Sequence, residues 1–597
     1  MKRVLHIVGL SYRSFLEVYK FDKRTVTLII AISVFSSLKT YFDIYLSKVM
    51  VDNLFDGDHQ ILFYALLALV VFKLLSSYLT AASTAKTARL TYKFNNKNDE
   101  ELIDKIEGME LIAKEHPRFN ADFPYLKYSK NQTYSLYLQF TQLIFKMLTL
   151  FVGLKYLFEL DTIFCFLAVL SGLLKGLLDL KPIKIRAKLN EDVQKKGVKY
   201  VYFYELLTSI RNQKELILYK AFNYFKQQWR RKKEEYDEIQ MALVKVNNKV
   251  FIQQEGISTF FEALIIILFA YLFSGESLTI GNYISLTMAV NITMFNFSSL
   301  IHEYAQMSEN YVHYERVNQD SYYSNTYNKT KYEGNREFKI NHNISVSNLN
   351  FTYPNTENQA LKEINLLINK GETVVILGDN GSGKSTLVKV LVGLYRTNID
   401  SVFVDGISMK EFKSDSISEK CSVVFQDFIQ YQTTIRDNIG IGDINNIENE
   451  SRMNKVLKHV DIKMNNYRLE TKVGLVYENA VNLSGGQWQR LALSRFYFKE
   501  NPEMAVFDEV TSALDPLTEV RLFNDIVSYC KDITTIIISH RVGIARKADK
   551  IIVMENGRII EQGNHKQLLD NNGKYTEMWL SQKEWYQEEQ KGEFIRG

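Results

Sequence analysis

Residues 378–386 read G-D-N-G-S-G-K-S-T, and this stretch decides the fold of the second half of the chain. An apolar run of strand type, 373–377, comes before it, and an apolar helical pattern, 387–394, comes after it. A glycine-rich turn between a strand and a helix is the setting of a phosphate-binding loop, because its backbone N–H groups converge on phosphate oxygens. For this motif taken alone, the alternative is a turn that only caps a helix.

The residue types in this loop suit a nucleotide. Lys384 can neutralise the charge of the β- and γ-phosphates, and the hydroxyl of Ser385 can bind Mg²⁺. The candidate nucleotide-binding residues are Gly378, Asp379, Asn380, Gly381, Ser382, Gly383, Lys384, Ser385 and Thr386. ATP and Mg²⁺ are the expected cofactors.

Polar residues also follow three other apolar runs of strand type. These residues are Gln426, Asp508 with Glu509, and Ser539 with His540. Gln426 can reach Mg²⁺ or a water. Asp508 can contact the direct ligands of Mg²⁺ without binding the metal itself, and Glu509 can polarise the attacking water. His540 can hold the γ-phosphate. Each of these residues taken alone is better explained as the end of a buried strand. Their occurrence together, in this order along the chain, favours a catalytic site.

The segment 483–487 reads L-S-G-G-Q and opens a helix, so it offers a second helix N-terminus for an anion. One chain cannot easily bring this N-terminus onto its own phosphate loop, because both would compete for one anion at one sheet edge. Two chains facing each other would hold each ATP between Lys384 of one copy and Ser484 of the other. The candidate contacts in this segment are Ser484, Gly485, Gly486 and Gln487.

The first half of the 597-residue chain contains long apolar runs. Six of them have about the 20 residues needed to cross a bilayer. The expected spans are 25–47, 60–82, 135–157, 161–180, 254–273 and 279–301. The net charge of +5 is weak evidence for nucleic acid, because the basic residues of this half fall mainly in loops beside the runs. No nucleic-acid partner is expected.

The loops between the spans predict an orientation. The turns 51–60, 158–160 and 274–278 contain no Lys or Arg, so they are expected outside. The long charged connections, 86–133 and 181–249, are then expected in the cytoplasm with both termini and the ATPase domain. The expected location is the plasma (inner) membrane. The three cysteines show no metal-ligand or disulfide spacing, so no redox role is expected.

The two cytoplasmic connections are expected to contain long helices. Between Pro182 and Gly256 there is no proline and one glycine, Gly197, which is typical of uninterrupted helix. We interpret 116–125 and 200–210 as the tips of the two connections and as docking elements for the soluble half. The alternative is that both are plain surface turns.

Ionisable and amide side chains inside the spans are costly, so they usually face protein or water. Glu262, Lys146 and Asn291 are the candidates for a substrate cavity. The alternative for Glu262 and Lys146 is a structural pair with each other or with a neighbouring lysine.

The expected fold is an α-helical membrane domain of six spans followed by an α/β P-loop NTPase cassette with a helical signature subdomain. The expected divisions are an amphipathic helix on the cytoplasmic membrane face (1–24), a transmembrane domain (25–310), a linker (311–340), the cassette (341–582) and a charged tail (583–597). Tyr353, just upstream of the phosphate loop, could stack on a base or pack in the core.

Taken together, the motifs resemble those of the ATP-binding cassette (ABC) transporters, and six spans before one cassette are similar to type IV exporter half-transporters. The resemblance covers nearly the whole chain. It implies that Tyr353 stacks on adenine, that Gln426 is the Q-loop glutamine, that Asp515 in S-A-L-D is the D-loop aspartate and that His540 is the switch histidine. It also implies that the two docking elements are coupling helices. Val510 departs from the family, which often has a small residue there.

The segments S-V-V-F-Q-D-F at 422–428 and L-S-G-G-Q-W-Q-R at 483–490 resemble those of lantibiotic and bacteriocin-peptide exporters. The expected function is ATP-driven export of such a peptide. About 24 residues precede the first span and contain no cysteine, so any leader would be removed elsewhere. The expected partners are a second copy of the chain or a related half-transporter, membrane lipid, the peptide and its modifying enzymes. The alternatives are an exporter of lipids or drugs, and a sensor or self-protection protein that transports little.

Overall fold

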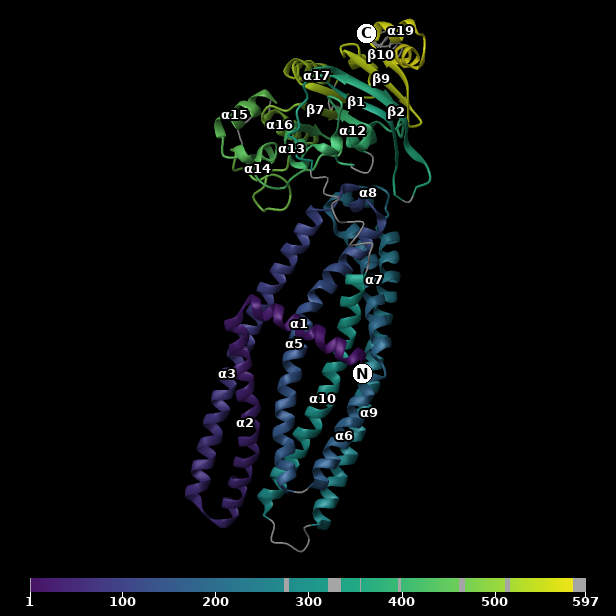
Figure 1. Ribbon diagram of the computed structural model, residues 1–597. Coiled ribbons are helices and arrows are strands. Elements are labelled where there is room, and N and C mark those ends of the chain that lie inside the picture. The colour runs from purple at the N-terminus through teal and green to yellow at the C-terminus, as the bar shows by residue number, and fades with distance from the viewer. Residues whose placement is uncertain are drawn as a thin grey trace. The chain divides into compact units, whose positions relative to one another are not determined.

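The computed structural model describes residues 2–160, 162–272, 279–319, 334–354, 356–395, 399–460, 468–510 and 516–582. The chain forms two compact units (Figure 1). The helical unit holds Met1–Met109 and Pro117–Tyr327, and the cassette unit holds Glu110–His116 and Asn328–Gly597. The segment Glu110–His116 therefore interrupts the helical unit in sequence but belongs to the cassette unit in space.

The helical unit is built from long helices. They are α1 (Lys2–Phe21), α2 (Lys23–Asp56), α3 (His59–Glu107), α5 (Pro117–Leu160), α6 (Thr162–Leu180), α7 (Ile183–Thr208), α8 (Ile210–Leu218), α9 (Phe222–Leu272) and α10 (Ile280–Gln319). At about 1.5 Å per residue, α9 is more than twice as long as the roughly 30 Å hydrocarbon core of a bilayer. The prediction of long uninterrupted helices in the second connection is thus confirmed.

Within the described part of the chain, five helices are long and apolar enough to cross a membrane. They are Lys23–Asp56, His59–Glu107, Thr162–Thr208, Phe222–Tyr271 and Ile280–Tyr311. They cover most of each of five predicted spans, and the remaining one, 135–157, lies inside α5.

Close helix packing in this unit depends on small residues. α10 lies beside α5 and α6, and α7 lies beside α9. A Cβ atom at Gly172 of α6 would lie 2.6 Å from Cβ of Phe297, and one at Gly176 would lie 2.3 Å from Cδ1 of Ile301. Glycines four residues apart therefore allow α6 to approach α10, as is common between membrane helices.

The amphipathic helix predicted over 1–24 is α1, which ends where the Asp22 side chain caps α2. Its apolar face is covered by protein, with Ile7 beside Leu136 of α5 and Met307 of α10. The location of α1 at the cytoplasmic membrane face stays a prediction.

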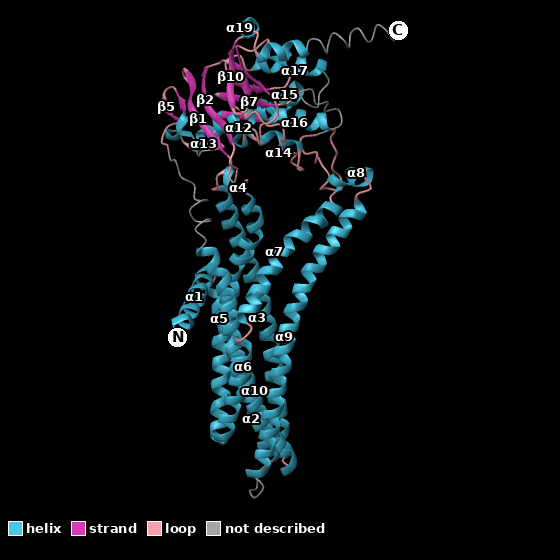
Figure 2. Ribbon diagram, turned by 90° about the vertical axis from the view of Figure 1, so that its right-hand side faces the viewer, coloured by secondary structure: helices cyan, strands magenta, loops and turns pink. Residues whose placement is uncertain are grey.

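The cassette unit contains two sheets (Figure 2). Its strands are β1 (Asn343–Thr352), β2 (Gln359–Asn369), β3 (Thr373–Gly378), β4 (Val402–Val404), β5 (Ile407–Ser408), β6 (Cys421–Val424), β7 (Met504–Asp508), β8 (Thr534–Ile538), β9 (Lys550–Glu555) and β10 (Arg558–Gly563). One sheet has the order β2-β1-β4-β5, and the other has the order β10-β9-β3-β8-β7-β6. In the second sheet all pairs are parallel except β10 with β9.

The cassette unit also contains shorter helices. They are α4 (Leu111–Lys114), α12 (Lys384–Leu391), α13 (Ser414–Lys420), α14 (Ile435–Gly440), α15 (Glu450–His459), α16 (Gly485–Phe498), α17 (Pro516–Tyr529), α18 (Val542–Ala545) and α19 (His565–Asp570). α14 and α15 pack against α16, and all three fall between β6 and β7 in sequence. This group is the helical subdomain that the L-S-G-G-Q segment predicted. Strands β3, β7 and β8 are buried along their whole length, as expected for continuous apolar runs in a parallel sheet.

Two predicted domain boundaries differ from the structure. α10 continues to Gln319, past the boundary expected at 310. The helix extends beyond the apolar residues from which the boundary was predicted. Phe338 and Ile340 are fully buried in the cassette core, so the cassette begins before 341. The tail expected over 583–597 lies outside the described residues.

Candidate nucleotide-binding site

The predicted catalytic residues gather at one edge of the six-stranded sheet. β3, β6, β7 and β8 are parallel, so their carboxyl ends meet at this edge, where open α/β sheets bind their ligands. The phosphate loop follows β3, Asp508 ends β7, and Gln426 and His540 lie two residues beyond the ends of β6 and β8. The expected positions of these residues after strands are therefore confirmed.

Lys384 is the first residue of α12 and points back into the phosphate loop. Its Nζ donates to the carbonyl oxygens of Gly378 and Asp379 at 2.8 and 2.9 Å. Burial lowers the pKa of Lys384, and the carboxylates of Glu509 and Asp508 oppose that shift. An ammonium group carries three hydrogens, so one donor remains for a phosphate oxygen.

The loop backbone needs glycine at three positions. Gly378, Gly381 and Gly383 have φ 148°, 80° and 101°, and a Cβ atom at Gly383 would lie 2.7 Å from the carbonyl oxygen of Ala360. At Gly381, by contrast, a Cβ atom would meet no heavy atom of the described structure within 4 Å. The loop is therefore tightly held at its base and open at its tip.

Two buried oxygen atoms at this edge have no hydrogen-bond partner among the described residues. They are Oγ of Ser382 and Oδ1 of Asp508. Burial raises the pKa of Asp508, the charge of Glu509 adds to that rise, and a hydrogen bond from Ser385 opposes it. A buried polar atom without a partner is costly, so these oxygens fit a site completed by a ligand.

The same residues fit Mg²⁺ bound together with a nucleotide. Mg²⁺ takes oxygen ligands and is usually held by one or two protein side chains plus phosphate oxygens and waters. Ser385 and Asp508 are hydrogen-bonded neighbours and supply such oxygens. The described residues contain no group of three His, Cys, Asp or Glu side chains that could hold a metal by themselves.

Glu509 lies between the other two catalytic candidates. Its Oε2 accepts a hydrogen bond from Nε2 of Gln426 at 2.8 Å, and its Oε1 lies 2.5 Å from Nε2 of His540. Glu509 also has φ 49°, a backbone conformation that is strained for a residue with a side chain. Each carboxylate oxygen has a second lone pair, so both contacts leave Glu509 able to accept a proton from water.

Gln582, which sequence analysis missed, fixes the backbone around His540. It lies at the end of a helix over 574–582. Its Nε2 donates to the carbonyl oxygen of His540 at 2.7 Å, and its Oε1 accepts from the backbone N–H of Val542 at 2.8 Å. No short-range pattern links Gln582 to a residue 42 positions earlier.

Tyr353 lies at the end of β1 with its ring partly exposed. Its hydroxyl shares a hydrogen bond with Oγ1 of Thr386 at 2.9 Å, and its ring meets those of Phe351 and Tyr395 nearly edge-on. The structure thus places Tyr353 against the phosphate-loop helix. Stacking of Tyr353 on adenine stays a prediction.

The L-S-G-G-Q segment forms the N-terminus of α16. The hydroxyl of Ser484 accepts from the backbone N–H of Gln487 at 3.3 Å, and Oε1 of Gln487 accepts from the N–H of Ser484 at 2.9 Å. A Cβ atom at Gly485 or Gly486 would meet nothing in the described structure within 4 Å. This N-terminus is therefore capped by its own residues and presents an open face. Asp515 lies outside the described residues.

The segment that clusters with the cassette unit lies earlier in the chain than the docking element predicted over 116–125, whose docking role stays a prediction. The segment Glu110–His116 contains α4, and Ile112 belongs to the same buried core cluster as β1 and α12. The residues from Pro117 onward instead begin α5. Pro117 misled the prediction because proline is also favoured in the first turn of a helix.

The second docking element was predicted over 200–210. The structure divides that stretch at Ser209, between α7 and the short helix α8. Its docking role stays a prediction.

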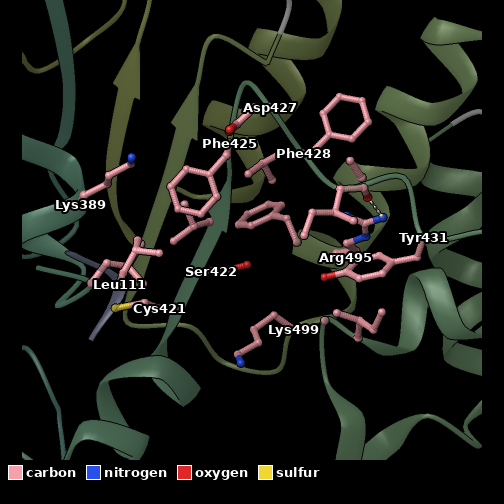
Figure 3. A pocket seen from close by; sticks show the side chains of 18 of the residues that line it. Leu111, Lys389, Cys421, Ser422, Phe425, Asp427, Phe428, Tyr431, Arg495 and Lys499 are labelled. Atoms are coloured by element: carbon pink, nitrogen blue, oxygen red, sulfur yellow. Dashed lines mark hydrogen bonds between the residues drawn. The ribbon is translucent and has the colours of Figure 1, made fainter. Parts of the chain in front are cut away.

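A cavity of about 520 Å³ lies beside the Glu110–His116 segment in the cassette unit (Figure 3). Leu111 and Cys421 line it on one side, and Tyr431 and Arg495 line it on another. Arg495 stacks over the Tyr431 ring at 4.7 Å and donates to the carbonyl oxygen of Ile429. This cavity also contacts Phe425, the residue before Gln426.

The three candidates for a substrate cavity are not brought together. Glu262 and Asn291 are exposed, and Lys146 forms an ion pair with Glu303 of α10 at 2.5 Å. The alternative of a structural pair is thus supported for Lys146, but its partner is Glu303. None of the three lines the cavity of about 680 Å³ that the helical unit contains elsewhere.

The loop, the carboxylate after β7 and the histidine after β8 define a P-loop ATPase domain, joined in one chain to a bundle of membrane-type helices. Residues 361–512 match the model of the family described as ABC transporter. The chain is 28% identical over 607 residues to the subtilin transport ATP-binding protein SpaT of Bacillus subtilis, covering 97% of this chain and 95% of that protein. It is 40% identical over 243 residues to the nisin transport ATP-binding protein NisT of Lactococcus lactis subsp. lactis, covering 40% of each.

Other relatives matched over 40% of this chain are named as a lipid A-core flippase and a putative multidrug export protein. A solved bacterial Atm1-family ABC exporter with ATP bound shares the fold, with a TM-score of 0.78 and 21% identity over 94% of this chain and 98% of that chain. Residues 361–512 therefore form an ABC transporter cassette, and the chain has the fold of an exporter half-transporter, in which this ATPase cassette is joined to a bundle of membrane-type helices.

Proposed function

We propose that this transporter uses ATP to export a lantibiotic-like or bacteriocin-like peptide across the plasma membrane, as a dimer of two identical chains. In the dimer, each ATP would lie between the phosphate loop of one copy and the Ser484 end of α16 of the other. The cassettes would then face the cytoplasm with both termini. Closure of the two cassettes on ATP and their release after hydrolysis would alternate the side of the membrane to which the substrate site opens.

One observation carries the choice of a peptide. The similarity to SpaT, which is named for subtilin transport, extends over 97% of this chain and so includes the helical unit that would hold the cargo. The relatives named for lipid A or multidrug export match only 40% of this chain, a stretch of about the cassette's length. Cassettes are poor guides to cargo, because they bind the same nucleotide in every exporter.

The residues of the site support hydrolysis by in-line attack of water. Lys384, the loop N–H groups and the N-terminus of α12 would bind the β- and γ-phosphates. Bound Mg²⁺, held through Ser385 and Asp508, would neutralise the phosphate charge. Glu509 would orient the attacking water and accept its proton, while Gln426 and His540 hold the Glu509 carboxylate between them.

The test uses purified protein in sealed vesicles with the cassette outside. ATP and a precursor peptide are added outside, and uptake of labelled peptide is measured together with phosphate release. We expect peptide to enter the vesicles, to stimulate hydrolysis, and both activities to fall at least about 100-fold in Glu509→Gln. Glu419→Gln, an exposed change in α13, is the matched control.

Two other results would redirect the assignment. Stimulation by lipid extract or hydrophobic dyes, without stimulation by any peptide, would favour the lipid or drug exporter. ATP binding with hydrolysis that no cargo changes would favour a sensor or self-protection protein. Undiminished hydrolysis in Glu509→Gln would show that Glu509 is not the base.

A further inference from the structure

The cavity of about 680 Å³ in the helical unit is lined mainly by polar side chains. We name it the polar cavity. It is lined by Gln132, Ser135, Gln139, Asp179, Arg186, Asn190, Gln240, Leu243, Val244, Asn247, Val250, Phe251, Gln254, His302, Gln306, Glu309 and Asn310. These residues come from α5, α6, α7, α9 and α10, so five helices contribute to one site.

Asp179 is the centre of a hydrogen-bond network in this cavity. It is 4% exposed. It accepts from Nε2 of Gln254 at 2.8 Å and from Nη2 of Arg186 at 3.4 Å, and its Oδ2 lies 3.3 Å from Nδ1 of His302. The partners of Asp179 therefore come from three different helices, which fixes the shape of this wall.

His302 links this network to two glutamine side chains. Its Nε2 lies 2.7 Å from the amide nitrogen of Gln306, and its Nδ1 lies 3.3 Å from Oδ2 of Asp179. Gln306 in turn accepts from Nε2 of Gln139 at 3.3 Å. Apart from His302, the ionisable side chains that line the cavity are one guanidinium, on Arg186, and two carboxyl groups, on Asp179 and Glu309.

The second carboxylate is incompletely paired. Glu309 lies 3.8 Å from Nη1 of Arg186, and its Oε1 is buried without a hydrogen bond within the described structure. Gln139 is 8% exposed, and its Oε1 likewise accepts no hydrogen bond from the described residues. A buried carboxylate and a buried amide oxygen that both lack donors are costly, unless something else supplies the donors and a positive charge.

We propose that the polar cavity binds a protonated primary amine of the exported substrate, such as a lysine side chain. An ammonium group carries one positive charge and three N–H donors and no acceptor, which matches the carboxylate excess and the unfilled oxygens of this cavity. Arg186 donates to Asp179 through Nη2, whereas its Nε is buried without a hydrogen bond among the described residues. The inference rests on the proposed export function, because it names what that substrate presents to the helical unit.

Binding is tested on the full chain in lipid nanodiscs without nucleotide, by calorimetry. The probes are a six-residue peptide with a blocked amino terminus and one lysine, and its twin with the lysine amine acetylated. We expect the amine peptide to bind at least about tenfold more tightly, since a charge-assisted hydrogen bond contributes at least that factor. Glu309→Gln and Asp179→Asn should abolish this preference. Glu255→Gln, which removes a charge from the exposed residue next to Gln254, should retain it.

The outcomes separate this site from the function on which it rests. Equal affinity for both peptides, binding of neither, or a preference that survives Glu309→Gln overturns the amine site, and the cluster is then only a structural network. If Asp179→Asn fails to fold, Glu309→Gln alone decides. A preference for the amine without peptide transport into vesicles would support the site and contradict the export proposal. Peptide transport without a preference for the amine would support the export proposal and contradict the amine site.

Discussion

The hydroxyl of Tyr395 donates a hydrogen bond to the carboxylate of Glu115 at 2.6 Å, although the two residues are 280 positions apart. Glu115 belongs to the segment that interrupts the helical unit in sequence, and Tyr395 follows the phosphate-loop helix. The Tyr395 ring also meets Tyr353, whose hydroxyl is bonded to Thr386 of that helix. A chain of side chains therefore runs from the nucleotide loop to a segment that continues directly into α5.

The first prediction concerns this contact. Burial raises the pKa of Tyr395, with the hydrogen bonds to Glu115 and Tyr353 adding to the shift, so the phenol stays a donor at neutral pH. In Tyr395→Phe we expect the cassette to lose about 1 kcal/mol of stability and hydrolysis to respond less to cargo. Basal hydrolysis should change little, because no catalytic residue contacts Tyr395. The measurement is ATPase activity with and without cargo in nanodiscs, beside a thermal unfolding curve.

The control for Tyr395→Phe is Tyr477→Phe, which removes an exposed hydroxyl elsewhere in the cassette. If cargo stimulates both variants as strongly as the natural chain, the Tyr395–Glu115 contact does not transmit the signal.

The second prediction concerns Asp508 and pH. Burial raises its pKa above the unfolded value, so its contribution to stability is full at acid pH and is lost as pH rises through the folded pKa. The ionised group therefore destabilises the nucleotide-free cassette near pH 7. We expect Asp508→Asn to raise the Tm of the nucleotide-free protein by a few degrees, but to lose most of the stabilisation by Mg²⁺ with ATP.

Differential scanning fluorimetry at pH 5 and pH 7.5, with and without Mg²⁺ and ATP, measures both effects of Asp508→Asn. The gain in Tm should be larger at pH 7.5, and Asp532→Asn, at an exposed position, should show none. A lower Tm at pH 7.5 would mean that the buried carboxylate stabilises the cassette without a ligand.

The sequence predicted the site well where each residue follows a strand. Gln426, Asp508 and His540 could be placed because parallel strands bring their carboxyl ends to one edge, and this rule depends only on local apolar runs. It failed where a partner comes from a distant part of the chain. Glu115 and Tyr395 meet only through the fold, and so do Gln582 and His540.

The cavity residues of the helical unit were harder to predict from the sequence, again because their contacts depend on the fold. Apolar length indicates a span but not which face of a helix meets protein. Glu262 and Asn291 fall on exposed faces, whereas Asp179 and Arg186 share a cavity because α6 ends between them. An Asp and an Arg on either side of the end of the span predicted over 161–180 were the one available signal in the sequence.

The third prediction is that Gln582 positions His540. Its side-chain amide contacts the backbone on both sides of Arg541, so Gln582→Ala removes two hydrogen bonds from the loop that carries the histidine. We expect kcat for ATP hydrolysis to fall about fivefold to tenfold while KM for ATP changes less than twofold, because no binding residue is altered. Gln562→Ala, an exposed change in β10, is the control. A rise in KM with unchanged kcat would place Gln582 in binding instead.

The fourth prediction concerns the ion pair of Lys146 with Glu303. Glu303 is 4% exposed. Removing one partner leaves the other charge buried and unpaired, so we expect Lys146→Met or Glu303→Gln alone to cost about 3 kcal/mol. The double variant should recover most of that loss, because no charge remains without a partner. Thermal unfolding in detergent gives the coupling, and Glu262→Gln, an exposed acid of α9, should be neutral. If the losses of stability add in the double variant, the two side chains act independently. Lys146 would then remain a candidate for contact with the transported substrate.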